Sequence, residues 1–194
     1  EFKIDVKTFR HDFETQGPSV AGIEPVRAME RLKRFKDEYE FRDRKYKMCK
    51  IGEELFAMSE TKYPALIKTK KELTLLTQLY DLYDNVLKTA KDWNDILWTD
   101  VVSNIEDMTQ MVENFDSKCN KMPRKLREWD AYKTLRGQID DFTSVLPLLE
   151  ELGKESIEVR HWDEIKNITG TDFDQDAEDF KLETLLAANL PHYS

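Results

Sequence analysis

The fold is decided by one stretch of the chain, residues 66–101, which reads LIKTKKELTLLTQLYDLYDNVLKTAKDWNDILWTDV. Its large apolar side chains recur every seven residues, in steps of three and four. The members of this repeat are Leu66, Leu73, Leu76, Tyr80, Tyr83, Leu87, Ala90, Leu97 and Val101, with Thr69 and Asn94 as polar members. A second row runs beside it through Leu75, Leu79, Leu82, Val86 and Trp93. Two adjacent rows are too wide for a two-stranded coiled coil, so the pattern predicts a long helix covered on two sides, as in a bundle.

The helical pattern extends in both directions from this stretch, and the chain has only 6 Gly and 6 Pro to interrupt it. Helices are predicted over about residues 25–56, 64–101, 101–119, 126–142, 157–168 and 180–190, with breaks at residues 59–63, Pro123, Pro147 and Gly170. Pro25 suits the first turn of a helix, because the N–H groups there lack helical partners. Phe2, Ile4 and Val6 alternate instead, which predicts an extended segment at the N-terminus.

These elements predict an all-α fold, an elongated bundle of long antiparallel helices followed by shorter helices. The predicted organisation has three parts: an extended lead-in over residues 1–22, a long-helix bundle over residues 23–120, and shorter helices over residues 121–194. The chain begins at Glu1 rather than at a methionine, so we expect it to be a segment of a longer protein.

The composition excludes several classes of partner. A net charge of −9 argues against nucleic acid and against an anionic lipid surface, because both require clustered Lys and Arg with little opposing acid. No run approaches the roughly 18 apolar residues that a membrane span needs. Cys49 and Cys119 lie at core positions of helical patterns, and two thiols in 194 residues do not make a disulfide framework. A reducing compartment is therefore expected.

The motifs that resemble nucleotide or metal sites are incomplete. Gly17 and Gly22 have the separation of a phosphate-binding loop, but Ile23 and Glu24 stand where that loop requires Lys and Ser or Thr. A calcium loop is suggested by the acidic residues Asp172, Asp174, Asp176 and Glu183, at positions 1, 3, 5 and 12. Ala177 replaces its turn-forming glycine and Asp179 its usual apolar residue, so a solvated acidic loop before a helix is the preferred interpretation.

No catalytic set emerges from the remaining polar residues. The histidines are dispersed, at His11, His161 and His192. A bundle enzyme would need Glu and His at i,i+3 spacing on two helices, and Glu158 with His161 has no counterpart. We expect Trp162 to pack in the core, with Arg160 and His161 bonded to neighbouring backbone carbonyls. The sequence therefore predicts no catalytic, cofactor-binding or metal-binding residue.

Several short motifs together resemble the heavy chains of dyneins. They are Leu79–Tyr83 (LYDLY), Trp93 and Trp98, Pro123 with Trp129 and Tyr132, Ile139–Phe142 (IDDF), Leu146–Leu149 (LPLL) and Arg160–Trp162 (RHW). The likeness covers about residues 15–190 and falls in the second conserved N-terminal region, where the tail runs into the linker. The opening, from Gly17-Pro18 to Gly52–Phe56 (GEELF), is similar to axonemal dyneins of the outer arm.

This resemblance implies a mechanical and non-catalytic role, in which residues 121–194 lead into the linker that swings across the ATPase ring. It implies the cytoplasm and the axoneme of a cilium or flagellum as location. The implied partners are the linker and ring of the same heavy chain and other dynein subunits, with microtubules reached only through the full-length motor. The sequence leaves one main alternative: a helical scaffold module of the spectrin or coiled-coil adaptor type, which needs only long amphipathic helices and an acidic surface.

Overall fold

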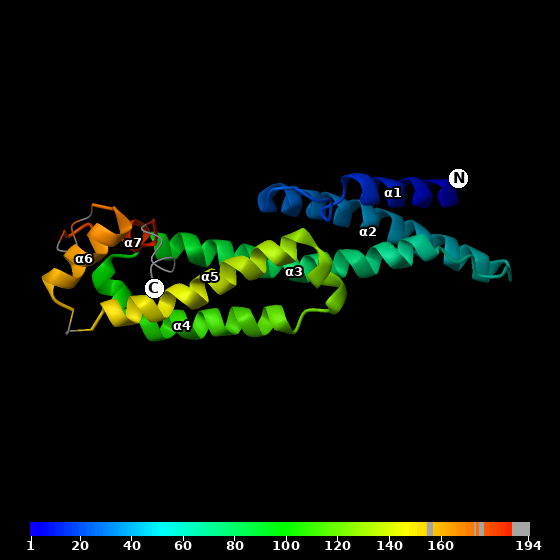
Figure 1. The fold of residues 1–194 in the computed structure, drawn as a ribbon. Coiled ribbons are helices and arrows are strands. Elements are labelled where there is room, and N and C mark those ends of the chain that lie inside the picture. Colours follow the sequence, from blue (N-terminus) through cyan, green and yellow to red (C-terminus); the bar gives the residue numbers. More distant parts are fainter. Residues whose placement is uncertain (155–156, 173, 175–176, 188–194) are drawn as a thin grey trace. The chain divides into compact units, whose positions relative to one another are not determined.

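The computed structural model describes residues 1–154, 157–172, 174 and 177–187, and in these residues every regular element is a helix. The α-helices are α1 (Phe2–Gln16), α2 (Pro25–Leu55), α3 (Pro64–Asn94), α4 (Trp98–Asn120), α5 (Asp130–Leu152), α6 (Val159–Thr169) and α7 (Leu182–Ala187), with a 3₁₀-helix, η1 (Arg124–Glu128), before α5 (Figure 1). The predicted all-α fold class is confirmed. The predicted helix starts at Pro25 and Pro64 are also confirmed.

The helices group into two compact units. Unit 1 comprises residues 1–81 and 122–133, and unit 2 comprises residues 82–121 and 134–194. These boundaries differ from the predicted division after residue 120. The physical reason is that α3 and α5 each supply residues to both units, which a reading along the chain does not reveal.

In unit 1, α1 packs on α2 through aromatic side chains. Phe35 of α2 lies edge-on to Phe13 of α1, with ring centroids 5.4 Å apart, and it also contacts Phe9 at 5.9 Å. Each of these rings buries a large apolar area, and tilted or edge-on pairs are favourable beyond that burial. A buried hydrogen bond from the Tyr80 hydroxyl to the Pro18 carbonyl oxygen fixes the connection between α1 and α2 against α3.

The prediction of an extended lead-in over residues 1–22 is wrong for α1, which covers residues 2–16. Its buried residues are Phe2, Val6, Phe9 and Phe13, at steps of four, three and four. Ile4, which suggested a strand by alternation, is 69% exposed. The short window from Phe2 to Val6 fits both periods, and only the longer spacing identifies the helix.

Unit 2 is built on α4 and α5, which lie beside the second half of α3 (Figure 1). Its core includes Val101, Met108, Val112 and Phe115 of α4, and Leu135, Ile139, Leu146 and Leu149 of α5. Trp93 of α3 meets Phe142 of α5 edge-on, with centroids 5.3 Å apart. Towards the C-terminus, Trp98, Trp162 and Phe180 form an aromatic trio with centroid distances of 5.7 to 6.5 Å.

Two predicted helix boundaries are corrected by the structure. The repeat over residues 66–101 is not one helix, because α3 ends at Asn94 and α4 begins at Trp98. Between them the chain turns so that Trp98 N–H donates to the Phe180 carbonyl oxygen and Leu182 N–H to that of Ile96. Pro147 was expected to end a helix, yet it lies inside α5. The buried residues Leu146 and Leu149 continue the apolar face past it, and their burial offsets the one lost hydrogen bond.

Candidate functional site

The buried charged residue of the described part of the chain is Glu72 of α3. It forms a cluster in unit 1 with the partly buried Arg10 of α1 and the exposed Lys125 of η1. Arg10 Nη1 donates to one oxygen of Glu72, and Lys125 Nζ donates to the other at 2.9 Å. Arg10 also donates to Thr69 Oγ1 at 3.1 Å and to Glu14 at 2.7 Å. Glu72 is 8% exposed and Thr69 is fully buried. Both carboxylate oxygens of Glu72 are therefore bonded to cations.

The charge state of Glu72 follows from these contacts. Burial alone would raise the pKa of this carboxyl, but the hydrogen bonds from Arg10 and Lys125 outweigh it and hold the pKa below its usual value. Hydrogen bonding by Arg10 also lowers the pKa of Glu14. An ionised carboxylate with both oxygens occupied is not available as a general acid or base. The cluster is suited to holding three helical elements together, not to catalysis.

We expect the stabilising contribution of Glu72 to be lost in acid. The pKa of Glu72 in the folded chain lies below its value of about 4.3 in the unfolded chain. Between these two pKa values the unfolded chain binds more protons at this carboxyl than the folded chain does. The contribution of Glu72 to stability is therefore complete only at a pH above the unfolded pKa. It declines as the pH falls through the folded pKa. Glu72→Gln should cost about 2 to 3 kcal/mol at pH 7, and the gap to the unsubstituted chain should narrow below about pH 4.

Thermal unfolding followed by circular dichroism between pH 7 and pH 2 measures this gap. Glu40→Gln is the matched control, because it removes one exposed carboxylate from α2. A gap for Glu72→Gln that stayed constant across the pH range would show that the charged cluster does not contribute as described.

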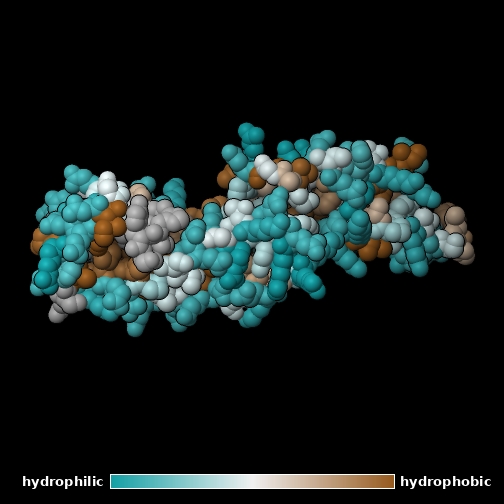
Figure 2. Space-filling model, in the orientation of Figure 1, coloured by the Kyte–Doolittle hydropathy of each residue, from teal (hydrophilic) through white to brown (hydrophobic). Residues whose placement is uncertain are grey.

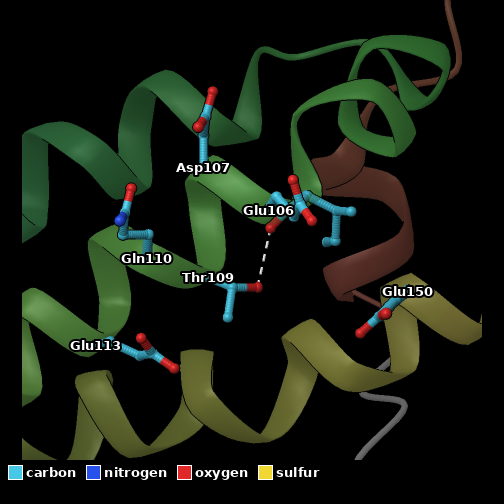
Figure 3. Close-up of a pocket in the computed structure, with 7 residues that line it drawn as sticks. Glu106, Asp107, Thr109, Gln110, Glu113 and Glu150 are labelled. Carbon is cyan, nitrogen blue, oxygen red and sulfur yellow. Dashed lines mark hydrogen bonds between the residues drawn. The ribbon is translucent and has the colours of Figure 1, made fainter.

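A second polar feature is a depression of about 320 Å³ in unit 2, beside α4 (Figure 3). Its lining residues are Ile105, Glu106, Asp107, Thr109, Gln110, Glu113 and Glu150. Glu113 of α4 and Glu150 of α5 lie across it from each other, whereas Asp107 and Gln110 point away from α5 (Figure 3). The carboxylates are exposed, and the Thr109 hydroxyl donates to the Ile105 carbonyl oxygen at 2.9 Å. The lining residues thus include no nucleophile paired with a base, and the depression lacks a catalytic arrangement.

The glycines of the incomplete phosphate loop have structural roles. Gly17 ends α1, and a Cβ at this position would lie 2.1 Å from the Phe13 carbonyl oxygen, so only glycine fits without a shift of the backbone. Gly22 has a φ of +78°, which favours glycine. Both positions serve the connection between α1 and α2.

The residues of the incomplete calcium loop are exposed where the structure describes them. This holds for Asp172 and Asp174, and Glu183 lies in the first turn of α7. Asp176 lies outside the described residues. In the described part of the chain, no three His, Cys, Asp or Glu side chains are grouped to hold a metal ion.

The tripeptide Arg160-His161-Trp162 forms the first turns of α6. Trp162 is buried, which confirms its predicted core position. The prediction that Arg160 and His161 bond to backbone carbonyls is wrong. His161 Nδ1 accepts the Glu158 N–H at 2.9 Å as part of a capping box, and Arg160 forms an exposed ion pair with Glu158. A helix N-terminus presents free N–H groups rather than carbonyls, so acceptors are needed here.

The remaining sequence candidates do not converge on a site. His11 is exposed on α1, and His192 lies outside the described residues. Cys49 is half-buried beside the cluster of Phe2, Val6 and Leu66, whereas Cys119 is buried in unit 2, and neither cysteine is in a disulfide. The described helices include none that is both long enough and apolar enough to span a bilayer.

Comparison with known proteins gives relatives along almost the whole chain. Residues 66–194 match the family described as dynein heavy chain, N-terminal region 2. The chain is 40% identical over 192 residues to the dynein gamma chain of the flagellar outer arm of Chlamydomonas reinhardtii, covering 99% of this chain and 4% of that protein.

Two mammalian relatives have similar identities. Dynein axonemal heavy chain 5 of Rattus norvegicus is 38% identical over 192 residues, which is 99% of this chain and 6% of that protein. Dynein axonemal heavy chain 8 of Mus musculus is 40% identical over 189 residues, which is 97% of this chain and 4% of that protein. The chain thus spans about a twentieth of the length of these relatives.

Proposed function

We propose that this chain, which belongs to the dynein heavy chain family, is a non-catalytic mechanical segment of an axonemal motor. It transmits force between the ATPase ring and the tail of the heavy chain. The family assignment rests on the match over residues 66–194 and on the axonemal relatives. The mechanical role is our inference from the build of the helices.

The observation that carries this proposal is the continuity of α3. This helix runs for 31 residues, and after Pro64 it contains neither glycine nor proline. Leu76, Leu79 and Tyr83 in its middle are almost fully buried. The chain passes from unit 1 to unit 2 within this helix, between residues 81 and 82. A helix whose middle is packed resists bending, because a kink would need both a broken backbone hydrogen bond and a disturbed core.

The charged cluster supports the same role. Arg10, Glu72 and Lys125 come from α1, α3 and η1, and their mutual bonds resist sliding of these elements past one another. Removing Arg10 would leave the buried Glu72 carboxylate with the exposed Lys125 as its remaining bonded cation. The cluster therefore favours a single arrangement of unit 1 under load.

The proposed role requires no nucleotide, metal or cofactor in this segment. Its partners are the linker and ATPase ring of the same heavy chain and other dynein subunits, with microtubules engaged only by the full-length motor. The proposed location is the cytoplasm and the axoneme of a cilium or flagellum. Neither nucleic acid nor a membrane is a proposed partner.

The test is a helix break at Gln78, an exposed position of α3. Proline there removes a backbone hydrogen bond and clashes with the preceding turn, which kinks the helix at a cost of about 3 kcal/mol. In the full-length motor, Gln78→Pro is expected to lower microtubule gliding speed severalfold while leaving ATP turnover largely intact. Gln78→Ala keeps the helix and is the matched control.

Gliding at normal speed by Gln78→Pro, with the kink verified in the purified heavy chain, would contradict force transmission through α3. The scaffold alternative would then account better for the long helices, because a scaffold needs their surface and not their stiffness.

A further inference from the structure

A groove lies between α4 and α5 in unit 2 and continues the depression beside α4. Its volume is about 340 Å³, and it shares Thr109, Glu113 and Glu150 with that depression. Its other lining residues are Val112, Asp116, Thr143, Leu146 and Pro147. We call this feature the α4–α5 groove. The chain is 36% charged, and hydrophilic side chains cover most of the face of the molecule shown in Figure 2. On so polar a chain, a groove with apolar lining residues is a candidate binding surface.

The groove combines an apolar surface with a backbone acceptor. Val112 of α4 and Leu146 of α5 are buried core residues that also line the groove, and Pro147 is an exposed one. These three residues offer a surface on which an aliphatic chain can pack. Because proline has no N–H, the Thr143 carbonyl oxygen, four residues earlier in α5, lacks the donor that a helix supplies. This oxygen is an acceptor that needs a donor from elsewhere.

Two carboxylates of the groove have no cation in the described part of the chain. Glu113 and Glu150 lie across from each other, on α4 and α5 (Figure 3). Both are exposed, and neither forms an ion pair with a described residue. Asp116, a third carboxylate of the lining, is bonded to Arg136 at 2.7 Å, so this arginine is already engaged. The groove therefore has two negative charges that the described chain leaves unpaired.

The two helical stretches that border the groove carry no positive charge of their own. Residues 98–117 contain five Asp or Glu and residues 137–153 contain four, and neither range contains Lys or Arg. Lys118 follows the first range, but it lies about 140° around α4 from Glu113. Lys154 follows the second range and forms an ion pair with Glu151. Since like charges held close together repel, a cation supplied from outside stabilises this surface.

These features match the chemistry of an arginine side chain. The aliphatic stem of arginine packs on apolar surfaces, and its planar guanidinium carries five N–H donors. The groove offers two carboxylates and one carbonyl oxygen as acceptors, at Glu113, Glu150 and Thr143. A lysine ammonium has three donors and lacks the planar fork that bonds carboxylates in pairs, so arginine suits this set of acceptors better.

The length of chain outside this segment favours one source for the arginine. More than nine-tenths of each of the three relatives lies outside the stretch that this chain matches. A segment tethered within the same polypeptide has a high effective concentration at the groove, whereas a separate subunit has to be recruited. Two copies of the groove would bring carboxylates against carboxylates, which opposes pairing of the groove with itself.

We infer that the α4–α5 groove docks an arginine from another stretch of the same heavy chain, outside these 194 residues, with its guanidinium between Glu113 and Glu150. The contact fastens that stretch to unit 2. This inference rests on the proposed place of the chain within a dynein heavy chain. It is independent of force transmission through α3.

Site-specific photo-cross-linking in the intact axonemal dynein complex identifies the occupant. A benzophenone amino acid replaces Thr143 in the full-length heavy chain, and the control variant carries it at Ser144, an exposed neighbour that does not line the groove. We expect Thr143 to cross-link to an arginine-containing peptide of the same heavy chain, at a yield at least about tenfold above that of Ser144. Reconstitution from a mixture of isotopically light and heavy chains separates this cross-link from one to a second copy.

Charge removal supplies the second arm of the experiment. Glu113→Gln with Glu150→Gln should lower the yield about tenfold, because both charges are lost while the side-chain size is kept. The matched control is Asp107→Asn with Asp141→Asn, which changes the charge of the same two helices equally. Asp107 points away from α5 (Figure 3), and Asp141 is exposed and does not line the groove. The control should keep the yield, and circular dichroism verifies that each variant is folded.

An exchange of charges distinguishes a direct contact from a structural effect. Replacing the arginine of the cross-linked peptide with glutamate should abolish the cross-link, because carboxylates then face each other. Adding Glu113→Arg and Glu150→Arg to that variant should restore the cross-link.

Three cross-linking results would overturn the inference: a peptide without arginine, a peptide from another subunit or a second copy, and a Thr143 yield no higher than that of Ser144. Equal yields for the glutamine pair and the asparagine pair would overturn it as well. Failure of the force-transmission proposal is read separately, from the gliding speed of Gln78→Pro.

Discussion

Replacing Trp162 with alanine is expected to lower the free energy of unfolding by about 3 to 5 kcal/mol, through lost burial and the cavity that remains. The indole is 7% exposed and lies edge-on to both Trp98 and Phe180. Because these partners come from α4 and from the segment before α7, the loss should loosen the contacts among the C-terminal elements of unit 2 first.

Chemical denaturation followed by tryptophan fluorescence and circular dichroism measures this loss. Val159→Ala is the control on the same helix, since Val159 is 63% exposed and its truncation opens no cavity. Should Trp162→Ala unfold at the same denaturant concentration as Val159→Ala, the trio would not anchor these helices and Trp162 would be better explained as a contact surface.

Phe35→Ala should have an effect of similar size in unit 1, about 3 to 5 kcal/mol. Phe35 is 1% exposed and packs between the rings of Phe9 and Phe13, so its removal takes away the aromatic contact between α1 and α2. We expect α1 to detach in this variant while α2 and α3 keep most of their helical signal.

Phe41→Ala is the matched control, because it makes the same substitution on the same helix at a ring that is 59% exposed. Hydrogen exchange of the α1 amides distinguishes detachment from global unfolding. Protection of α1 in Phe35→Ala equal to that in Phe41→Ala would mean that the aromatic contact is not what holds the helix.

The long helices were predictable because their apolar period persists over many turns. In α3, the repeat from Leu66 to Tyr83 corresponds to side chains that are buried in the structure. The break at residues 95–97 was not predictable from periodicity, because it depends on backbone hydrogen bonds to Phe180 and Leu182, far along the chain. Pro147 shows the converse, since a local helix breaker is overridden by the packing of Leu146 and Leu149.

The family was predictable from short motifs, and the comparisons confirm it. The charged cluster was not predictable, because Glu72 meets Arg10 and Lys125 across 62 and 53 positions of sequence. The only local signal was Glu72 itself, which lies one helical turn after Thr69 and next to the apolar row of α3. The exposure of Phe41, Met48, Ile51 and Leu55 on α2 was not predictable either, because their spacing equals that of a buried helix face.

The pairing of Leu97 with Lys181 determines where the chain can be truncated without loss of a tertiary backbone contact. The two residues form an antiparallel bridge, and Lys181 Nζ also donates to Asp95 at 3.1 Å across 86 positions of sequence. A truncation before Phe180 would remove the partners of the Trp98 N–H and the Ile96 carbonyl, and with them the start of α4. Recombinant fragments should therefore extend at least through Ala187, whereas a fragment ending after α5 would leave the α3–α4 turn without its tether.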